Sequence, residues 1–417
     1  MLIIFIFTGA FTIGLFPQSK LLIPMDLNQS DHLKAYGITY RALTKGYKAD
    51  WLINYRSGSF FIDFSDDVAV ECRVEGVLFE EISFSDVTQI YAFVQSEENN
   101  MDVIRLEQAP KIAVYVPPGF QPWDDAVTLA LEYASVPYDK IWNDEIIKGD
   151  LDNYDWLHLH HEDFTGQYGK FYASFSNAQW YVDQQLQYEH NANKNGYRKV
   201  SDMLKTVAVE IRNYVGKGGF LFAMCSATDS YDIALSALSV DIAETMYDGD
   251  AADPNAQEML NFNNTLAFTD FKVEMNPYIY EYSDIDIQPI EIGNFANDYF
   301  TLFEFSAKYD PVPTMLTQSH ANVIRGFMGQ TTMFRRSTIK SSVIVMAERK
   351  DTDQVKYIHG NYGRGTFTFY GGHDPEDYQH AVGDPPTDLN LHKNSPGYRL
   401  ILNNILFPAA TKKKQKT

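Results

Sequence analysis

An alternation of short apolar runs with helical patterns, beginning at residue 111, constrains the fold of this chain more than any other feature. Runs of strand length occur at residues 111–116, Tyr138–Trp142, Asp155–His160 and Phe220–Met224. Helical patterns lie between them, near Trp123–Ser135, over most of Tyr181–Tyr214 and from about Thr228. Strands that alternate with helices are typical of a parallel sheet covered on both faces. Further strands at Val343–Ala347 and Thr366–Tyr370 and a helix at Pro396–Leu406 would complete an α/β domain over residues 109–410.

A smaller α/β domain is predicted for residues 20–108. Lys20–Pro24 and Ala49–Asn54 have strand character, and a helical pattern from Ser30 to Thr44 separates them. The polar stretch Gln95–Asp102 is typical of an exposed turn. Shorter pieces with strand character lie near Phe60, Val70, Val77 and Ile90.

The first segment, Leu2–Phe16, is uncharged and mostly apolar. It is too short to span a bilayer comfortably and has the length of a signal-peptide core, although no basic residue precedes it. We therefore predict a signal peptide over residues 1–19 and a periplasmic or secreted protein, with a buried N-terminal strand or a misplaced start codon as alternatives. Residues 411–417 are predicted to form a basic tail.

The charge balance restricts the partners that the chain can bind. Lys and Arg number 34 against 55 Asp and Glu, which gives a net charge of −21 and disfavours nucleic acid or an anionic membrane surface. Aromatic residues make up 14% of the chain, as is common in proteins that face carbohydrate. We expect a small-molecule, saccharide or peptide ligand, no cofactor and no membrane span in the mature chain, and no feature predicts the oligomeric state.

Only two cysteines occur, Cys72 and Cys225, and neither belongs to a CxxC pair. Cys225 stands in GGFLFAMCSATDSYDIAL, where a buried strand runs directly into a helix and small residues, Ala223 and Ala227, flank the cysteine. A nucleophile on a sharp strand-to-helix turn needs small neighbours at these positions. The helix N-terminus would lower the pKa of the thiol, and the amide of Ser226 could contribute to an oxyanion hole. An inert core cysteine is the alternative.

A candidate base follows the strand Thr366–Tyr370 in the motif YGGHDPED. His373 would lie just beyond the carboxyl end of that strand, where open α/β sheets bind their ligands. Glu376, three residues further on, could orient its imidazole. A polar turn with no catalytic role explains the motif equally well.

The order Cys225, His373, Glu376, with the motifs GG-x-x-x-x-x-C-x-A and GGHDPE, resembles the class I glutamine amidotransferase superfamily and its ThuA-like relatives. The resemblance implies a flavodoxin-like parallel sheet over about residues 111–408, with these three residues as nucleophile, base and orienting acid. Alanines replace the usual elbow glycines, the usual His-Pro-Glu motif is one residue longer, and a long insertion separates Cys from His. A repurposed or inactive site therefore stays open beside an active triad.

The whole chain also resembles an exported Bacteroidetes family that is often labelled asparagine synthetase B, in LLIPMDLNQSDHLKAYG and LHLHHEDFTGQYG. The residues do not support that label. An asparagine synthetase B exposes an N-terminal cysteine after Met removal, whereas this chain has Leu2. That enzyme also has an ATP pyrophosphatase loop, Ser-Gly-Gly-x-Asp-Ser, which does not occur in this sequence.

Further polar residues complete the predicted site. The segment YDWLHLHHEDFTGQYG is expected to bring His160, His161, Glu162 and Gly166 to the edge of the sheet as site-lining or oxyanion groups. A metal site there is conceivable, but no complete ligand set with a known spacing appears, so we predict none. Arg56, between a strand and a glycine turn, could bind a substrate carboxylate, and Asp229 is a second candidate substrate-binding residue.

Two functions are compatible with these residues. The first is an enzyme of the cell envelope that uses Cys225, His373 and Glu376 for acyl transfer or amide hydrolysis. The second is a non-catalytic protein that keeps the fold and binds a sugar or peptide in the same crevice. A reactive, accessible Cys225 would favour the enzyme, and a buried, inert thiol would favour the binding protein.

Overall fold

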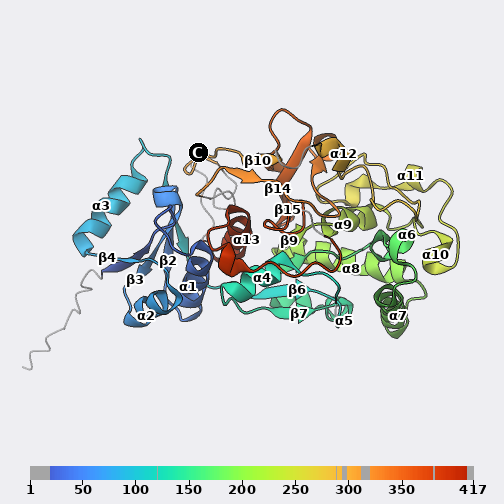
Figure 1. The fold of residues 1–417 in the computed structure, drawn as a ribbon, viewed down its shortest axis with the longest axis horizontal. Helices are drawn as coiled ribbons and strands as arrows, with labels where there is room; N and C mark the ends of the chain where they lie inside the picture. Colours follow the sequence, from blue (N-terminus) through green and yellow to red (C-terminus); the bar gives the residue numbers. More distant parts are fainter. Residues whose placement is uncertain are drawn as a thin grey trace, which may run out of the picture.

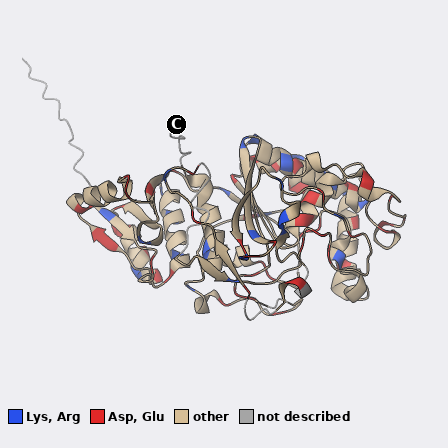
Figure 2. Ribbon diagram, turned by 90° about the horizontal axis from the view of Figure 1, so that it is seen from above, with Lys and Arg blue, Asp and Glu red and all other residues tan. Residues whose placement is uncertain are grey.

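The computed structural model describes residues 19–119, 121–287, 289–293, 298–310, 320–378 and 381–410, and its ribbon contains two β-sheets (Figure 1). The predicted signal peptide, apart from residue 19, and the predicted basic tail lie outside these ranges. Within the described ranges, no helix combines the length and apolar character needed to span a bilayer. Asp and Glu residues are spread over both sheet units rather than gathered in one of them (Figure 2).

The N-terminal sheet has the strand order β4-β1-β3-β2-β5, and all of its neighbouring strands are antiparallel. Its elements are β1 (Lys20–Ile23), α1 (His32–Thr44), β2 (Ala49–Ile53), β3 (Ser59–Asp63), α2 (Asp66–Glu75), β4 (Glu80–Ile82), α3 (Phe84–Gln95) and β5 (Asp102–Leu106). Because β3 lies between β1 and β2, the predicted β-α-β start is confirmed in its split form.

Two of the predicted N-terminal strands are helices, and a third is displaced. Val70 lies in α2 and Ile90 in α3. In α2 the buried residues Val68, Ala69 and Cys72 follow a helical spacing, whereas Val70 is 51% exposed. The exposed apolar side chain of Val70 therefore made the sequence of this helix resemble that of a strand. Val77 precedes the short edge strand β4, which begins only at Glu80.

The larger sheet has the order β11-β10-β13-β14-β15-β9-β8-β6-β7, with β12 paired to β14. Five strands form its parallel half: β6 (Ile112–Tyr115), β7 (Asp139–Ile141), β8 (Trp156–Leu159), β9 (Phe220–Met224) and β15 (Gly365–Tyr370). The antiparallel half comprises β10 (Tyr299–Leu302), β11 (Val323–Arg325), β12 (Phe334–Arg335), β13 (Ile344–Glu348) and β14 (Gln354–Tyr362).

The α/β class, with a smaller N-terminal α/β unit, is confirmed, although the larger sheet is mixed rather than wholly parallel. The long strand β14 links its two halves. Buried polar residues, Lys356 and His359, interrupt the apolar pattern of β14, so the sequence does not mark it as a strand.

Helices cover both faces of the parallel half, and side chains alternate between two hydrophobic cores. In β9, for example, Phe222 packs on one face and Leu221 on the other. The helices of the first face are α4 (Ala126–Tyr133) and α13 (Pro396–Leu406), and α1 packs between them and strands β2 and β3 of the N-terminal sheet. Those of the second face are α5 (Asn143–Lys148), α7 (Gln179–Lys194), α8 (Val200–Lys217) and α9 (Ala227–Ser236).

The N-terminal sheet and the last helix are joined by a buried guanidinium. Arg399 in α13 is fully buried and donates from Nε to the Tyr36 hydroxyl of α1 at 2.9 Å and from Nη1 to the Met25 carbonyl at 3.2 Å. The Tyr36 hydroxyl in turn donates to Asn403. The first and last helices of the described chain thus pack side by side, as Figure 1 shows for α1 and α13.

Candidate functional site

The loops that carry most of the predicted site residues lie at the carboxyl edge of the parallel strands. They follow β6, β8, β9 and β15. Because these strands are parallel neighbours or next neighbours, their carboxyl ends meet at one edge, which is where open α/β sheets bind ligands.

Cys225 occupies the predicted turn between β9 and α9. Its φ angle is 50°, in the left-handed region that non-glycine residues seldom adopt, and the helix begins two residues later at Ala227. Its own amide donates to the Gly372 carbonyl at 3.1 Å, which fixes the turn against the loop after β15. The predicted strand, sharp turn and helix are therefore confirmed as backbone structure.

The environment of the thiol differs from the expectation. Cys225 is 2% exposed, and burial raises the pKa of the thiol to about 11, although backbone N–H groups of Gln330, Thr331 and Ser226 favour the thiolate. The prediction that the helix N-terminus would give a low thiol pKa is therefore wrong, because desolvation outweighs the amide dipoles. The predicted oxyanion group, the Ser226 amide, faces the thiol itself.

His373 lies at the same edge and has a polar partner at each ring nitrogen. Its Nδ1 is 3.1 Å from Nε2 of His160, and its Nε2 is 3.0 Å from Oδ1 of Asp124. The carboxylate of Glu376 instead accepts from the Tyr378 hydroxyl at 2.8 Å and lies 3.0 Å from Nδ1 of His392. The carboxylate that holds His373 is thus Asp124, not the predicted Glu376.

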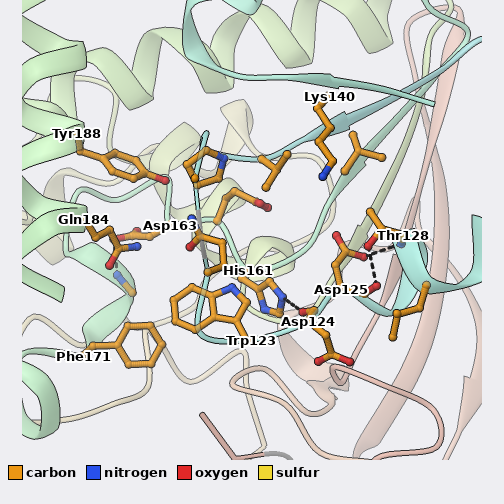
Figure 3. A pocket seen from close by; sticks show the side chains of 18 residues that line it. Trp123, Asp124, Asp125, Thr128, Lys140, His161, Asp163, Phe171, Gln184 and Tyr188 are labelled. Atoms are coloured by element: carbon orange, nitrogen blue, oxygen red, sulfur yellow. Dashed lines mark hydrogen bonds between the residues drawn. The ribbon is translucent and has the colours of Figure 1, made fainter. Parts of the chain in front are cut away.

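A cavity of about 280 Å³ opens beside this histidine, and we call it the Trp123 pocket (Figure 3). Its walls come from the loop after β6, the start of α4, the loop after β8 and α7. The side chains used below are those of Gln121, Trp123, Asp124, Asp125, Lys140, His161, Glu162, Asp163, Phe171, Gln184 and Tyr188. Cys225, His373 and Glu376 are not among the residues that line it.

Aromatic rings form one wall of the Trp123 pocket. The Trp123 and Phe171 rings are stacked with their centroids 5.4 Å apart, and the His161 ring lies 5.4 Å from Trp123. Trp180 packs edge-on against Trp123 at 5.6 Å. These contacts hold the half-buried Trp123 in one orientation at the mouth of the cavity.

The acidic side chains of the pocket differ in protonation. Burial alone would raise the pKa of Asp125, but the imidazoles of His158 and His160 hold it well below its usual range. Asp125 also caps α4 by accepting from the Val127 and Thr128 amides. Burial raises the pKa of Glu162 to about 8, so this side chain is largely protonated at neutral pH. The wall therefore offers both a carboxylate and a carboxylic acid.

The remaining predicted residues have other roles in the structure. Gly166 has a φ of 83°, and a Cβ there would lie 2.8 Å from that of Ser201, so it permits close packing on α8 rather than serving an oxyanion. Asp229 is buried near Cys225 and accepts from the Thr331 hydroxyl at 2.8 Å. Arg56 pairs with Asp26 at 2.7 Å and Glu80 at 2.6 Å in the N-terminal unit.

His161 and Glu162, predicted at the edge of the sheet, line the Trp123 pocket. Trp123, Asp124, Asp125 and Phe171 line it as well and were not among the predicted residues. A signal was present, because the PPGFQPWDD segment directly follows β6, a strand of the same parallel set. A tryptophan and two carboxylates between a strand and a helix of an open sheet occupy a ligand-binding position.

No known family profile matches the chain, and no curated protein matches it. Among solved structures, it is similar to the cytoplasmic proteins STM3548 and STM1381 from Salmonella typhimurium, each at 12% identity over 72% of this chain and 100% of theirs, with TM-scores of 0.35 and 0.37. It is also similar to Gan42B, a GH42 beta-galactosidase, at 12% identity over 64% of this chain and 28% of that one, with a TM-score of 0.28. Likenesses of this degree assign no function to the chain.

Proposed function

We propose that the protein binds a small, neutral, hydroxyl-rich ligand of the saccharide class in the Trp123 pocket. The observation that supports this most directly is the composition of the pocket, an aromatic wall beside carboxyl and amide groups at the ligand edge of the sheet. Apolar faces of sugar rings pack on aromatic rings, and their hydroxyl groups need donors and acceptors around the rim.

The charges and size of the pocket fit such a ligand. Glu162, protonated at neutral pH, can donate a hydrogen bond, ionised Asp125 can accept one, and Gln184 can do both. Lys140 is the one cationic side chain among the residues that line the cavity, so an anionic ligand is disfavoured. A volume of about 280 Å³ lies near the lower end of the roughly 300–1,000 Å³ of ligand sites and suits one or two sugar rings.

The test is a titration of the full chain with a panel of neutral mono- and disaccharides and one uronic acid, followed by tryptophan fluorescence and by saturation-transfer NMR. We expect saturable binding of at least one neutral sugar, and Trp123→Ala to weaken it about 30-fold, as for loss of an aromatic anchor worth about 2 kcal/mol. Tyr309→Ala is the matched control, because Tyr309 is 65% exposed and does not line the pocket. Equal affinity in Trp123→Ala, or no saturable binding by the parent, would contradict the proposal.

A second candidate is acyl transfer at Cys225, and one observation favours it: Cys225 occupies a left-handed turn, and its thiol faces the backbone amides of Ser226, Gln330 and Thr331. In this reaction Sγ attacks an amide carbonyl carbon, the C–N bond breaks, and the amine leaves with the thiol proton while a thioester forms. Incubation with an activated acyl ester should then leave an acyl group on Cys225 that is missing in Cys225→Ala. Absence of this adduct in the folded parent would exclude the candidate.

A further inference from the structure

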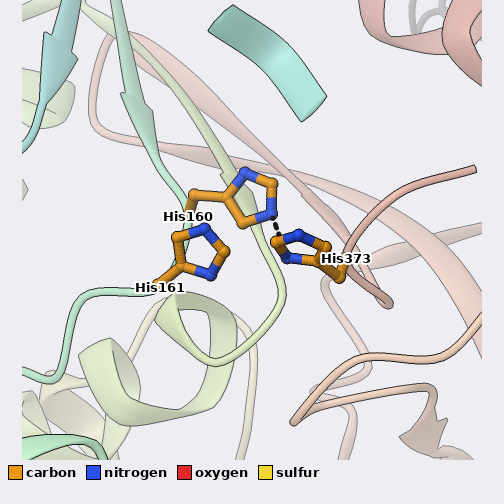
Figure 4. A group of neighbouring side chains, drawn as sticks. All are labelled: His160, His161 and His373. Carbon is orange, nitrogen blue, oxygen red and sulfur yellow. Dashed lines mark hydrogen bonds between the residues drawn. The ribbon is translucent and has the colours of Figure 1, made fainter. Parts of the chain in front are cut away.

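Three imidazoles meet at the edge of the Trp123 pocket (Figure 4). His160 and His161 follow β8, and His373 follows β15. Their ring centroids are 4.1 Å apart for His160 and His161, 4.5 Å for His161 and His373, and 4.7 Å for His160 and His373. One ring nitrogen of each lies within 4.8 Å of the others. We call these residues the histidine cluster.

The partners on the outer side of the cluster determine where each ring carries its proton. Nδ1 of His160 faces Oδ1 of Asp125 at 3.1 Å, and Nε2 of His373 faces Oδ1 of Asp124 at 3.0 Å. Nε2 of His161 faces the Asp124 carbonyl at 2.6 Å. An oxygen acceptor favours the tautomer in which the nitrogen that faces it carries the proton. In a neutral ring, the other nitrogen is then left with its lone pair.

This assignment places two lone pairs against each other. Nε2 of His160 and Nδ1 of His373 are 3.1 Å apart, and neither carries a proton when both rings are neutral. Either a proton shared between the two nitrogens or a cation bound by both would relieve the repulsion of their lone pairs. The separation is close to the roughly 3.3 Å between two nitrogens that bind one tetrahedral zinc ion at about 2.0–2.1 Å.

We propose that His160, His161 and His373 bind a divalent transition-metal ion, of which Zn²⁺ suits three imidazoles best. The oxygen acceptors behind the rings are the partners that metal-binding histidines ordinarily have, because they fix the tautomer and orient the ring. His161 and Asp124 also line the Trp123 pocket, so the fourth coordination position would face that cavity. The proposal does not depend on saccharide binding.

The sequence does not mark this site, because the ligands come from two distant segments and share no known spacing. Two further groups of possible metal-binding residues lie in the described chain. One comprises Asp125, His158 and His160, and its carboxylate already pairs with both imidazoles. The other comprises Asp241, Asp248 and Asp250 and has the Lys199 ammonium among its carboxylates, at 2.5, 3.1 and 2.5 Å. That lysine already neutralises part of their charge. We assign the metal to the histidine cluster, because oxygen acceptors face its three imidazoles and orient them.

The test uses the full chain after dialysis against a chelator, titrated with ZnCl₂ by calorimetry and with CoCl₂ by visible absorption. We expect one Zn²⁺ per chain and cobalt bands typical of four-coordinate imidazole ligation. His160→Asn and His373→Asn should each weaken binding more than tenfold, and Asp125→Asn should weaken it about 10- to 100-fold, as for loss of a residue that orients a ligand. His190→Asn, at an exposed histidine outside the cluster, and Asp250→Asn should bind as the parent does.

The cobalt spectrum of the parent keeps the test decisive if a histidine variant fails to fold. Absence of saturable Zn²⁺ uptake by the parent, or a cobalt spectrum of oxygen-only ligation, would overturn the proposal. In that case the two facing nitrogens share a proton instead of a metal. Failure of sugar binding with normal zinc uptake would overturn the proposed function alone.

Discussion

Cys225 and the Trp123 pocket lie on the same edge of one sheet, yet their surroundings are opposite. Cys225 sits after β9 and is 2% exposed, whereas the pocket that begins after β6 is an open cavity of about 280 Å³. The backbone amides of Gln330 and Thr331 face the thiol, and the Cys225 amide donates to Gly372 in the loop after β15. A backbone turn suited to a nucleophile is therefore no guide to whether a substrate can reach it.

The carboxyl groups of the two regions differ in the same way. Near Cys225, burial without a cation raises the pKa of Asp229 to about 7. In the pocket, Asp125 is also buried, but the His158 and His160 imidazoles hold its pKa well below the usual range. The pocket thus combines a neutral acid, Glu162, with the ionised Asp125, whose charge is kept in place by paired imidazoles, whereas the Asp229 carboxyl lies in a desolvated core. This contrast can be tested by four measurements.

The largest effect is expected for alkylation of Cys225 in a Cys72→Ala background, where it is the single thiol. A thiol with a pKa of about 11 reacts roughly 300-fold more slowly near pH 7 than a free cysteine with a pKa of about 8.5. Iodoacetamide labelling followed by mass spectrometry, with the denatured chain as reference, measures the ratio. Labelling of the folded chain at the rate of the denatured one would remove the difference between the two regions.

Asp125→Ala should destabilise the chain by about 3 kcal/mol, because it removes the cap of α4 and leaves two buried imidazoles without their carboxylate. Urea unfolding gives the change. Ser83→Ala, which removes only the cap of α3, should cost about 1 kcal/mol. Equal losses in the two variants would mean that the His158 and His160 contacts add nothing to stability.

Asp229→Asn should alter the pH dependence of stability. Folding raises the pKa of Asp229 from about 3.8 to about 7. The stability that this carboxyl contributes to the folded chain is therefore fully present below pH 3.8 and is lost as the pH rises through 7. As the pH rises across that window, the free energy of unfolding of the asparagine variant should therefore increase relative to that of the parent by about 1.4 kcal/mol per pH unit. Unfolding between pH 4 and 8 measures the trend, and the exposed Asp183→Asn should show none.

The smallest effect is expected for the turn itself. Cys225→Gly should be more stable than Cys225→Ala by about 1 kcal/mol, because glycine adopts a φ of 50° without strain whereas alanine does not. Thermal unfolding of the two variants gives the difference. The reverse order would show that the left-handed turn is not retained once the thiol is gone.

The sequence was sufficient for the parallel half of the fold and for the turn at Cys225, because apolar runs and small flanking residues report directly on local structure. It was insufficient for β14, in which Lys356 and His359 interrupt the apolar pattern and are buried by distant segments. The pairing of His373 with Asp124 rather than Glu376 joins two loops far apart in the chain. The exposure of a side chain and the pKa of its titratable group depend on such tertiary contacts. The sequence could therefore indicate an edge of the sheet, but it could not indicate the exposure of Cys225 or the partner of His373.

The contact between α1 and α13 affects the order in which the chain can fold. The hydrogen bond from Arg399 to Tyr36 spans 363 positions, so it forms only after α13 has left the ribosome. Until then, the apolar side of α1 has no partner from the last helix. Nascent chains that stall before α13 should consequently expose this surface to chaperones, and refolding should show a late step when α13 docks.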